Sequence, residues 1–302
     1  MTQIQANGIT LEYEDYPSSA ASNGETVLLI MGLGAQLTAW PPALVAALNA
    51  RGYRVIRYDN RDVGLSQKFG ESGPADMGAI MAALASGTKP NAAYLLDDMA
   101  ADAAGLLKAL GIARAHIVGA SMGGMIAQQV AANHPQVTLS LTSIMSTTGN
   151  PALPPARPEA MAVLLNRPAS TAMEDIVAAG VAAQQTIGSK VHPVDEAELR
   201  ARVTASYHRS HYPEGFGRQM AAIMASGDRR EALKRITAPT MVVHGADDPL
   251  VLVDGGLDTA ATIGGAELRI LPGMAHDLPE PLIPAVVEAI EAAAARARAP
   301  AK

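Results

Sequence analysis

Short apolar runs alternate with longer amphipathic segments along the first half of this chain. The clearest run, 26–31, is almost wholly apolar, as expected for a strand that is buried on both faces. Further strands are predicted at 53–58, 116–119 and 137–145, and helices at 41–50, 95–110 and 122–133. This alternation of strands and helices implies right-handed crossovers and a mostly parallel sheet that is covered by helices on both faces.

The beginning and the end of the chain add to this sheet. Residues 4–6 and 10–13 flank Asn7-Gly8, which is typical of a two-residue hairpin turn, so we expect an antiparallel pair there. Strand patterns return at 239–245 and 267–272, and a final helix is predicted at 282–293.

The segment between these two halves has a different pattern. Four prolines, at 151, 154, 155 and 158, interrupt the chain, and helix-like segments follow at about 158–166, 171–186, 193–210 and 215–235. We therefore expect an α/β core formed by 1–149 and 236–302, with a helical cap inserted at 150–235. Because the insertion leaves the sheet after the strand 137–145, the cap should fold over the carboxyl ends of the strands.

Composition limits the classes of function that fit. The 302 residues are 49% hydrophobic and 17% charged, which is typical of a globular protein. The net charge of −6, without a basic cluster, argues against a nucleic-acid partner. Cysteine is absent, which excludes disulfides and a cysteine nucleophile. The early apolar run is too short to cross a membrane and no signal region precedes it, so we expect a cytoplasmic protein with no membrane partner.

The segment 119–123, Gly-Ala-Ser-Met-Gly, links a predicted strand directly to a predicted helix. A sharp strand-to-helix turn holds a serine exposed and strained, and small residues are favoured on either side of it. Ser121 is therefore the candidate nucleophile. The N–H of Met122, in the first turn of the helix, is a candidate donor to a developing oxyanion.

A serine nucleophile needs a base, and the chain has seven histidines. His276 follows the last predicted strand, and His244 ends the strand before it. Loops at the carboxyl ends of parallel strands line the ligand crevice of open α/β sheets, which favours His276. We expect His244, one residue before Gly245, to be packed within the strand end.

The base in turn needs a carboxylate to orient it. Asp247 and Asp248 both lie at the carboxyl end of the strand 239–245, whereas the loop after 137–145 contains no acidic residue. Asp248 is favoured because Pro249 fixes the turn immediately after it. Asp247 is expected to cap the turn or to face solvent.

The order Ser121, Asp248, His276 resembles the nucleophile–acid–base order of the α/β-hydrolase family. The segment 59–66, Asp-Asn-Arg-Asp-Val-Gly-Leu-Ser, resembles a structural turn of that family. Within that family, the chain resembles the small capped carboxylesterases of the aclacinomycin methylesterase group in the segments 31–34, 57–62, 121–123 and 273–279. The resemblance implies a second oxyanion donor, the N–H of Leu33. Met31 stands where many of these proteins have histidine.

Several residues are candidates for the substrate pocket. They are Trp40, Tyr207, Met220 and Met224, although methionine also fills gaps in ordinary cores. No cofactor or metal is expected, and we interpret the pair His208 and His211 as part of a solvated helix face.

The residues thus predict a serine carboxylesterase that acts through an acyl-enzyme on a small-molecule substrate, a short- to medium-chain ester. The resemblance implies methyl esters as further substrates. Lactone opening, C–C bond hydrolysis and perhydrolysis use the same triad and stay open as alternatives. A second class is a ligand-binding receptor of the same fold with weak turnover, against which the intact Ser121, Asp248 and His276 argue.

Overall fold

The computed structural model describes residues 2–18, 23–166 and 168–298. Its centre is an eight-stranded sheet with the order β1-β2-β4-β3-β5-β6-β7-β8. The strands are β1 (Thr2–Ala6), β2 (Ile9–Tyr16), β3 (Thr26–Ile30), β4 (Arg54–Tyr58), β5 (Ala115–Ala120), β6 (Thr138–Ile144), β7 (Thr240–Gly245) and β8 (Glu267–Leu271). The β1–β2 and β2–β4 pairs are antiparallel, and the remaining neighbours in this described sheet are parallel. The predicted α/β architecture is confirmed.

The hairpin at the start of the sheet forms where Asn7-Gly8 predicts it. Ala6 pairs with Ile9, so the turn has two residues. The φ angles of Asn7 and Gly8 are 51° and 79°, and positive φ at both positions is what a type I′ turn requires.

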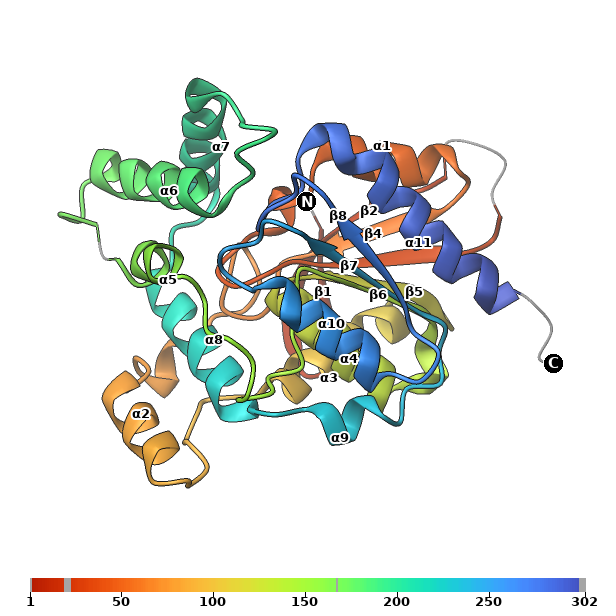
Figure 1. Cartoon of the computed structure of the whole chain (residues 1–302), viewed down its shortest axis with the longest axis horizontal. Coiled ribbons are helices and arrows are strands. Elements are labelled where there is room, and N and C mark those ends of the chain that lie inside the picture. The colour runs from red at the N-terminus through yellow and green to blue at the C-terminus, as the bar shows by residue number, and fades with distance from the viewer. Residues whose placement is uncertain (1, 19–22, 167, 299–302) are drawn as a thin grey trace.

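Two apolar layers cover the sheet, one on each face. Val27 and Leu29 of β3 point into the layer formed with α1 (Pro42–Ala50) and α11 (Ile283–Arg298). Leu28 and Ile30 point into the layer formed with α3 (Leu96–Ala109) and α4 (Met122–Asn133). Figure 1 shows α1 and α11 above the sheet, and α3, α4 and α10 (Val253–Thr262) below it. Trp40 is fully buried in the α1–α11 layer.

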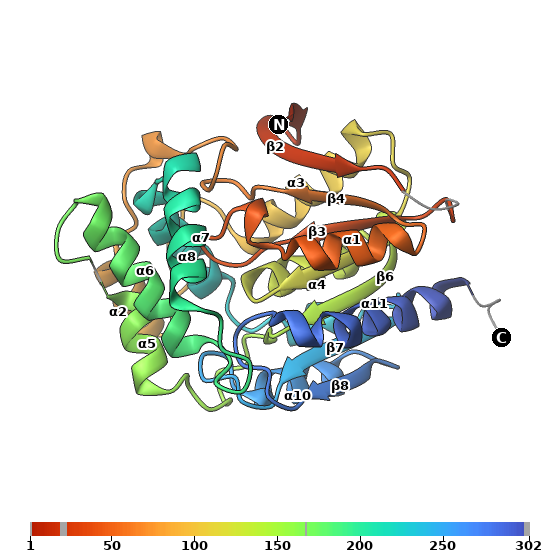
Figure 2. The ribbon, with the colours of Figure 1, turned by 90° about the horizontal axis from the view of Figure 1, so that it is seen from above.

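The inserted helices lie together on one side of the sheet in both views (Figures 1 and 2). They are α5 (Pro158–Leu165), α6 (Met173–Ile187), α7 (Glu196–Arg209) and α8 (Pro213–Ser226). A helix that the sequence did not predict, α2 (Met77–Ala85), packs beside α8. The helix α10 was not predicted either. The cap boundaries 150–235 stay a prediction.

The single helix predicted at 215–235 is wrong in extent. Helix α8 ends at Ser226, because the chain turns at Gly227 with a φ of 53°. A separate short helix, α9 (Arg230–Leu233), then packs against α4 of the core.

Short 3₁₀ helices complete the described elements. They are η1 (Leu37–Ala39), η2 (Gly70–Ser72), η3 (Pro135–Val137) and η4 (Glu280–Leu282). Among the helices described, none has the length and apolar character needed to span a bilayer.

Candidate active site

Ser121 lies in the sharp turn between β5 and α4. Its φ of 57° and ψ of −122° fall in a region that non-glycine residues rarely adopt, at a typical cost of about 1–3 kcal/mol. The surrounding chain holds this conformation. The Ser121 N–H donates to the Ile144 carbonyl over 2.9 Å, and the Ser146 hydroxyl donates to the Ser121 carbonyl over 2.9 Å.

Glycine is required on both sides of this turn because backbone atoms approach closely. A Cβ at Gly119 would lie 2.0 Å from the Gly123 carbonyl oxygen. A Cβ at Gly123 would lie 2.0 Å from the carbonyl oxygen of Ile30, on β3. The two glycines therefore let strand, turn and helix pack together around Ser121.

His276 lies between Ser121 and Asp248. Its Nε2 is 3.0 Å from the Ser121 Oγ, and its Nδ1 is 2.8 Å from Oδ2 of Asp248. A carboxylate only accepts hydrogen bonds, so Nδ1 carries the proton. This leaves the Nε2 lone pair facing the serine hydroxyl, as a base requires.

The structure brings Asp248, and not Asp247, to His276. The Asp248 side chain is fully buried, and its Oδ1 accepts N–H bonds of 2.9 Å from both Leu250 and Val251. The exposed Asp247 instead accepts the N–H of Gly273 over 3.1 Å. It thereby braces the loop that carries His276.

His244 is packed at the end of β7, as the sequence indicates. It is fully buried, and its Nε2 lies 2.8 Å from the Val251 carbonyl, which can only accept. Burial lowers the pKa of His244, so the ring is neutral. Its Nε2 proton is committed to Val251, and the ring is not the partner of Ser121.

The loop that carries His276 is also held by the connection between α6 and α7. The His276 N–H donates to the Ile187 carbonyl over 3.0 Å, and the Ser189 N–H donates to Asp277 Oδ2 over 3.0 Å. Burial raises the pKa of the Asp277 carboxyl despite this bond. The inserted helices therefore contact the backbone of the candidate base itself.

The two predicted oxyanion donors lie beside Ser121. Met122 is the first residue of α4, whose first N–H groups have no partner within the helix. Leu33 lies in a turn closed by the Ala35 N–H on the Gly32 carbonyl (3.2 Å), and the Gly34 φ of 66° suits its third position. A Cβ at Gly32 would lie 3.1 Å from the Ser121 Cβ, so this turn lies against the candidate nucleophile.

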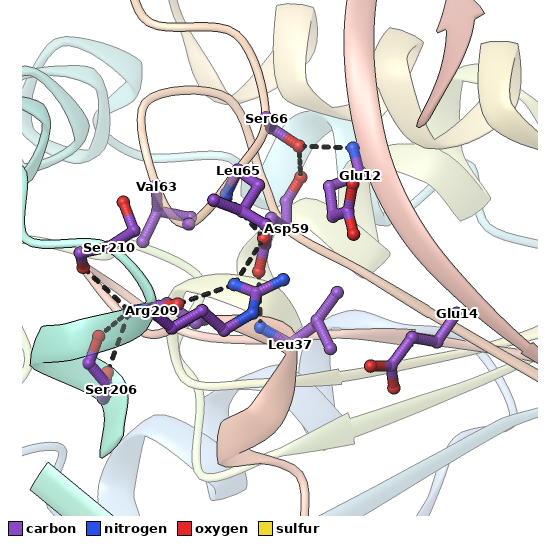
Figure 3. A network of polar contacts seen from close by, with 12 residues as sticks. Glu12, Glu14, Leu37, Asp59, Val63, Leu65, Ser66, Ser206, Arg209 and Ser210 are labelled. Carbon is purple, nitrogen blue, oxygen red and sulfur yellow. Dashed lines mark hydrogen bonds and ion pairs between the residues drawn. The ribbon is translucent and has the colours of Figure 1, made fainter. Parts of the chain in front are cut away.

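The segment 59–66 joins the core to the inserted helices through buried charges. Asp59 is fully buried and accepts the N–H groups of Leu37 and Leu65, over 2.7 and 2.8 Å. It also pairs with Arg209 of α7 at 2.8 Å (Figure 3). Asp59 thus compensates the charge of Arg209 while fixing the local backbone.

A second buried pair joins Asp62 to Arg218 of α8 through two bonds, of 2.8 and 2.9 Å. Burial acts to raise the pKa of Asp62, but hydrogen bonds from Arg218, the Phe69 N–H and Tyr94 hold that pKa below its usual value. Asp62 is therefore ionised, and the ion pair is intact at neutral pH.

Ser121 and His276 open into a cavity of about 1460 Å³ between the core and the inserted helices. Nine methionines line it: Met31, Met77, Met81, Met122, Met125, Met145, Met161, Met220 and Met224. The predicted pocket residues Met220 and Met224 are thus brought to the site. The structure does not bring Trp40 or Tyr207 there, because Trp40 is buried in the core and the Tyr207 ring packs on His211.

No group of three His, Asp or Glu side chains that could hold a metal lies within the described ranges. Two residues that join the segment 31–37 beside Ser121 to the inserted helices were not found from the sequence. Gln219 on α8 accepts the Gly34 N–H over 2.8 Å, and the Gln36 side chain bonds to Ser206 and Arg209 of α7. A lone glutamine in a helical segment gives no signal of such a role.

The chain is similar over most of its length to several proteins that are named as esterases, hydrolases or lactonases. The chain is 29% identical over 285 residues to the rhodomycin D methylesterase DauP of Streptomyces sp. (strain C5), covering 86% of this chain and 89% of that protein. It is 30% identical over 269 residues to the putative carbamate hydrolase RutD of Variovorax paradoxus (strain S110), covering 88% and 90%. The enol-lactonase structure from Burkholderia xenovorans LB400 superposes with a TM-score of 0.71 at 21% identity, covering 97% of this chain and 99% of that one.

A model of the alpha/beta hydrolase fold family matches residues 25–280, which include all of the candidate site residues. The eight-stranded, mostly parallel sheet with helices on both faces is the fold that this match implies. This chain is a hydrolase and belongs to the α/β hydrolase fold family.

Proposed function

We propose that this protein is a serine carboxylesterase whose nucleophile is Ser121. The observation that carries the proposal is the chain of hydrogen bonds from Ser121 Oγ to His276 Nε2 (3.0 Å) and from His276 Nδ1 to Asp248 (2.8 Å). His276 takes the serine proton as Oγ attacks the ester carbonyl. The N–H groups of Leu33 and Met122 stabilise the oxyanion.

Still in the first half of the reaction, acylation, His276 changes from base to acid. The imidazolium gives its proton to the leaving alcohol, and the acyl group stays on Ser121. In the second half, deacylation, His276 takes a proton from water as the water attacks the acyl-enzyme, and it returns that proton to the Ser121 Oγ as the acid leaves. Asp248 stabilises the imidazolium in both halves while its own position is fixed by Leu250 and Val251.

The cavity supports a substrate class. Its volume of about 1460 Å³ exceeds the roughly 300–1,000 Å³ of ordinary ligand pockets, and methionine side chains adapt to irregular apolar shapes. Similarity to proteins named methylesterases supports the same reading. Among short- to medium-chain and methyl esters, we therefore favour the methyl ester of a bulky, largely apolar acid. The inserted helices, as a cap over 150–235, exclude bulk water from the reaction.

The test is the activity of Ser121→Ala on p-nitrophenyl butyrate, with thermal unfolding as a check of folding. Loss of a triad serine typically lowers kcat by about 10⁶-fold. A fluorophosphonate probe should label the wild-type protein at Ser121, as located by peptide mass spectrometry. A folded variant that keeps more than about a hundredth of the wild-type rate would overturn the assignment.

A panel of esters then separates the substrate classes. We expect the highest kcat/KM on methyl esters of large polycyclic or branched acids, and low rates on long-chain emulsified lipids. A wild-type protein that binds these esters without turning them over would instead be a receptor with this fold.

A further inference from the structure

The segment 31–37, here called the oxyanion loop, is anchored at both ends by the core. Asn60 Nδ2 donates to the Met31 carbonyl over 2.9 Å. The Leu37 N–H donates to Asp59 over 2.7 Å. These two bonds fix where the loop leaves β3 and where it enters η1, but neither contacts the turn around Leu33.

The middle of the oxyanion loop is held from the other side, by the inserted helices. The Gly34 N–H donates to Oε1 of Gln219, on α8, over 2.8 Å. The Gln36 side-chain amide donates to the Ser206 carbonyl and hydroxyl, on α7, over 2.7 and 2.9 Å, and to the Ser210 carbonyl over 2.9 Å. Arg209 donates to Gln36 Oε1 over 2.6 Å. It also pairs with Asp59, as Figure 3 shows.

Gln219 has a single workable orientation in this contact. It is fully buried, and its Nε2 donates to the Arg61 carbonyl over 2.7 Å while its Oε1 accepts from Gly34. A flipped amide would point its NH₂ group at the Gly34 N–H and its oxygen at the Arg61 carbonyl, so both bonds would be lost. Gln219 is therefore a fixed link between the segment 59–66 and the oxyanion loop.

The bond between Gln219 and Gly34 affects the position of the Leu33 N–H, because Leu33 is one residue before Gly34. Within the part of the chain that the structure describes, this N–H has no hydrogen-bond acceptor, so it is free to bind a ligand. An oxyanion donor is effective when it is held in place before the reaction, at about 2.7–3.1 Å from the oxyanion. A turn with Gly34 at positive φ has little rigidity of its own, so its position depends on outside contacts.

We propose that Gln219 is a positioning residue for the oxyanion hole, with the contacts of Gln36 on α7 as a second anchor. Through them the inserted helices hold the Leu33 N–H where the oxyanion forms. This inference rests on the proposed function of Ser121. It gives the insertion a role in the reaction itself, beyond covering the cavity.

The test is Gln219→Met, which keeps the length and burial of the side chain and removes both hydrogen bonds. A displacement of about 1 Å in a catalytic group can cost up to about 100-fold in rate, so we expect kcat to fall about 10- to 100-fold. KM should change by less than about threefold, because the apolar cavity is untouched.

The affinity for an inhibitor that forms an oxyanion distinguishes a positioning role from a general loss of structure. A trifluoromethyl ketone that adds to Ser121 forms a hemiketal oxyanion, so its inhibition constant should rise by about the same factor as kcat falls. The affinity for an unreactive amide of the same acid should stay nearly constant. A variant whose affinity falls equally for both inhibitors would have lost structure rather than oxyanion stabilisation, and would overturn the proposal.

The matched control is Gln128→Met on α4. Gln128 is also fully buried, but its amide donates to Ser143 of β6 over 3.0 Å and not to the oxyanion loop. We expect its kcat to stay within about twofold of wild type. A drop equal to that of Gln219→Met would show that any lost buried amide has this effect, and would also overturn the proposal.

A second variant keeps the test open if Gln219→Met does not fold. Ser206→Ala removes one acceptor of Gln36 at a half-buried position, and should lower kcat about three- to tenfold with KM unchanged. Wild-type kcat in Ser206→Ala, and in Gln219→Met where that variant folds, with Ser121→Ala inactive, would refute the positioning role alone. Activity in Ser121→Ala would refute the proposed function.

Discussion

The turn at Ser121 and the oxyanion loop lie against each other, yet they are held in different ways. Ser121 is fixed by close backbone packing around Gly119 and Gly123, within one strand–helix unit and its neighbouring strands. The Leu33 turn is held by side chains from the insertion, and Gln219 is 185 residues away from Gly34 along the chain. The position of Ser121 is thus fixed by the core, whereas the position of the Leu33 turn depends on the inserted helices.

Three buried aspartates show the same contrast between contacts within the core and contacts with the inserted helices. Asp248 is held by N–H groups two and three residues further along its own loop. Asp59 and Asp62 are paired with Arg209 and Arg218, which belong to α7 and α8. A buried ion pair is costly to break, because removal of one partner leaves an uncompensated charge, typically at about 3–5 kcal/mol. Removal of either partner should therefore destabilise the attachment of the inserted helices.

Of the three predictions that test this contrast, the largest loss is expected for Asp248, which is held by its own loop. Asp248→Asn replaces the acceptor of the His276 Nδ1 proton with an amide that favours the wrong tautomer, so kcat should fall by about 10⁴-fold. Steady-state kinetics on p-nitrophenyl butyrate measures this. Asp247→Asn is the control, and it should keep at least about a third of the wild-type kcat. Equal losses in the two variants would mean that the loop, rather than the Asp248 carboxylate, is what matters.

A smaller but still large effect tests the backbone packing. Gly123→Ala would place a Cβ 2.0 Å from the Ile30 carbonyl oxygen, which cannot move without shifting β3. We expect the free energy of unfolding to fall by about 3 kcal/mol or more in urea titrations. Gly264→Ala, whose Cβ would meet nothing within 4 Å, should change it by less than about 0.5 kcal/mol. A Gly123→Ala protein as stable as wild type would refute the packing argument.

The smallest expected effect is a pH dependence of the free energy of unfolding, which comes from the ion pair that joins Asp62 to α8. The folded-state pKa of Asp62 lies below its value in the unfolded chain. The stability from this group is therefore complete above the unfolded pKa of about 3.9, and it is lost as the pH falls through the folded pKa. The gap in unfolding free energy between wild type and Asp62→Asn should narrow from pH 6 to pH 3, by at most about 1.4 kcal/mol per pH unit. A constant gap in urea titrations at the two pH values would contradict this role of Asp62.

Much of the core and the three central residues could be predicted from the sequence, because their causes are local. Short, almost wholly apolar runs such as 26–31 mark the buried strands, and Asn7-Gly8 marks the hairpin. Ser121, Asp248 and His276 each follow a strand, so the topology alone brings them to one edge of the sheet. The fold is confirmed, and the distances between these three side chains agree with the roles that we propose.

The helices and residues that were not predicted depend on features that an amino-acid sequence shows only weakly. Helix α10 contains Gly255-Gly256, which lowers helix propensity and hides the pattern. Helix α2 is apolar along most of its length, and only its cap, the Asp76 carboxylate that accepts the Ala79 N–H, marks its start. Trp40 follows the oxyanion loop in sequence, but η1 turns its ring into the core. Gln36 and Gln219 depend on partners that only the folded chain brings near.

The burial of Trp40 has an optical consequence. It is the one tryptophan of the chain, and it is fully buried in the α1–α11 layer. Its emission should be that of an indole in an apolar environment, and it should shift to the red only when this layer opens to water. Because the segment 150–235 contains no tryptophan, unfolding of the inserted helices alone should leave that spectrum nearly unchanged while the far-ultraviolet circular dichroism falls. A comparison of the two signals during denaturation would show whether the two parts of the molecule unfold together.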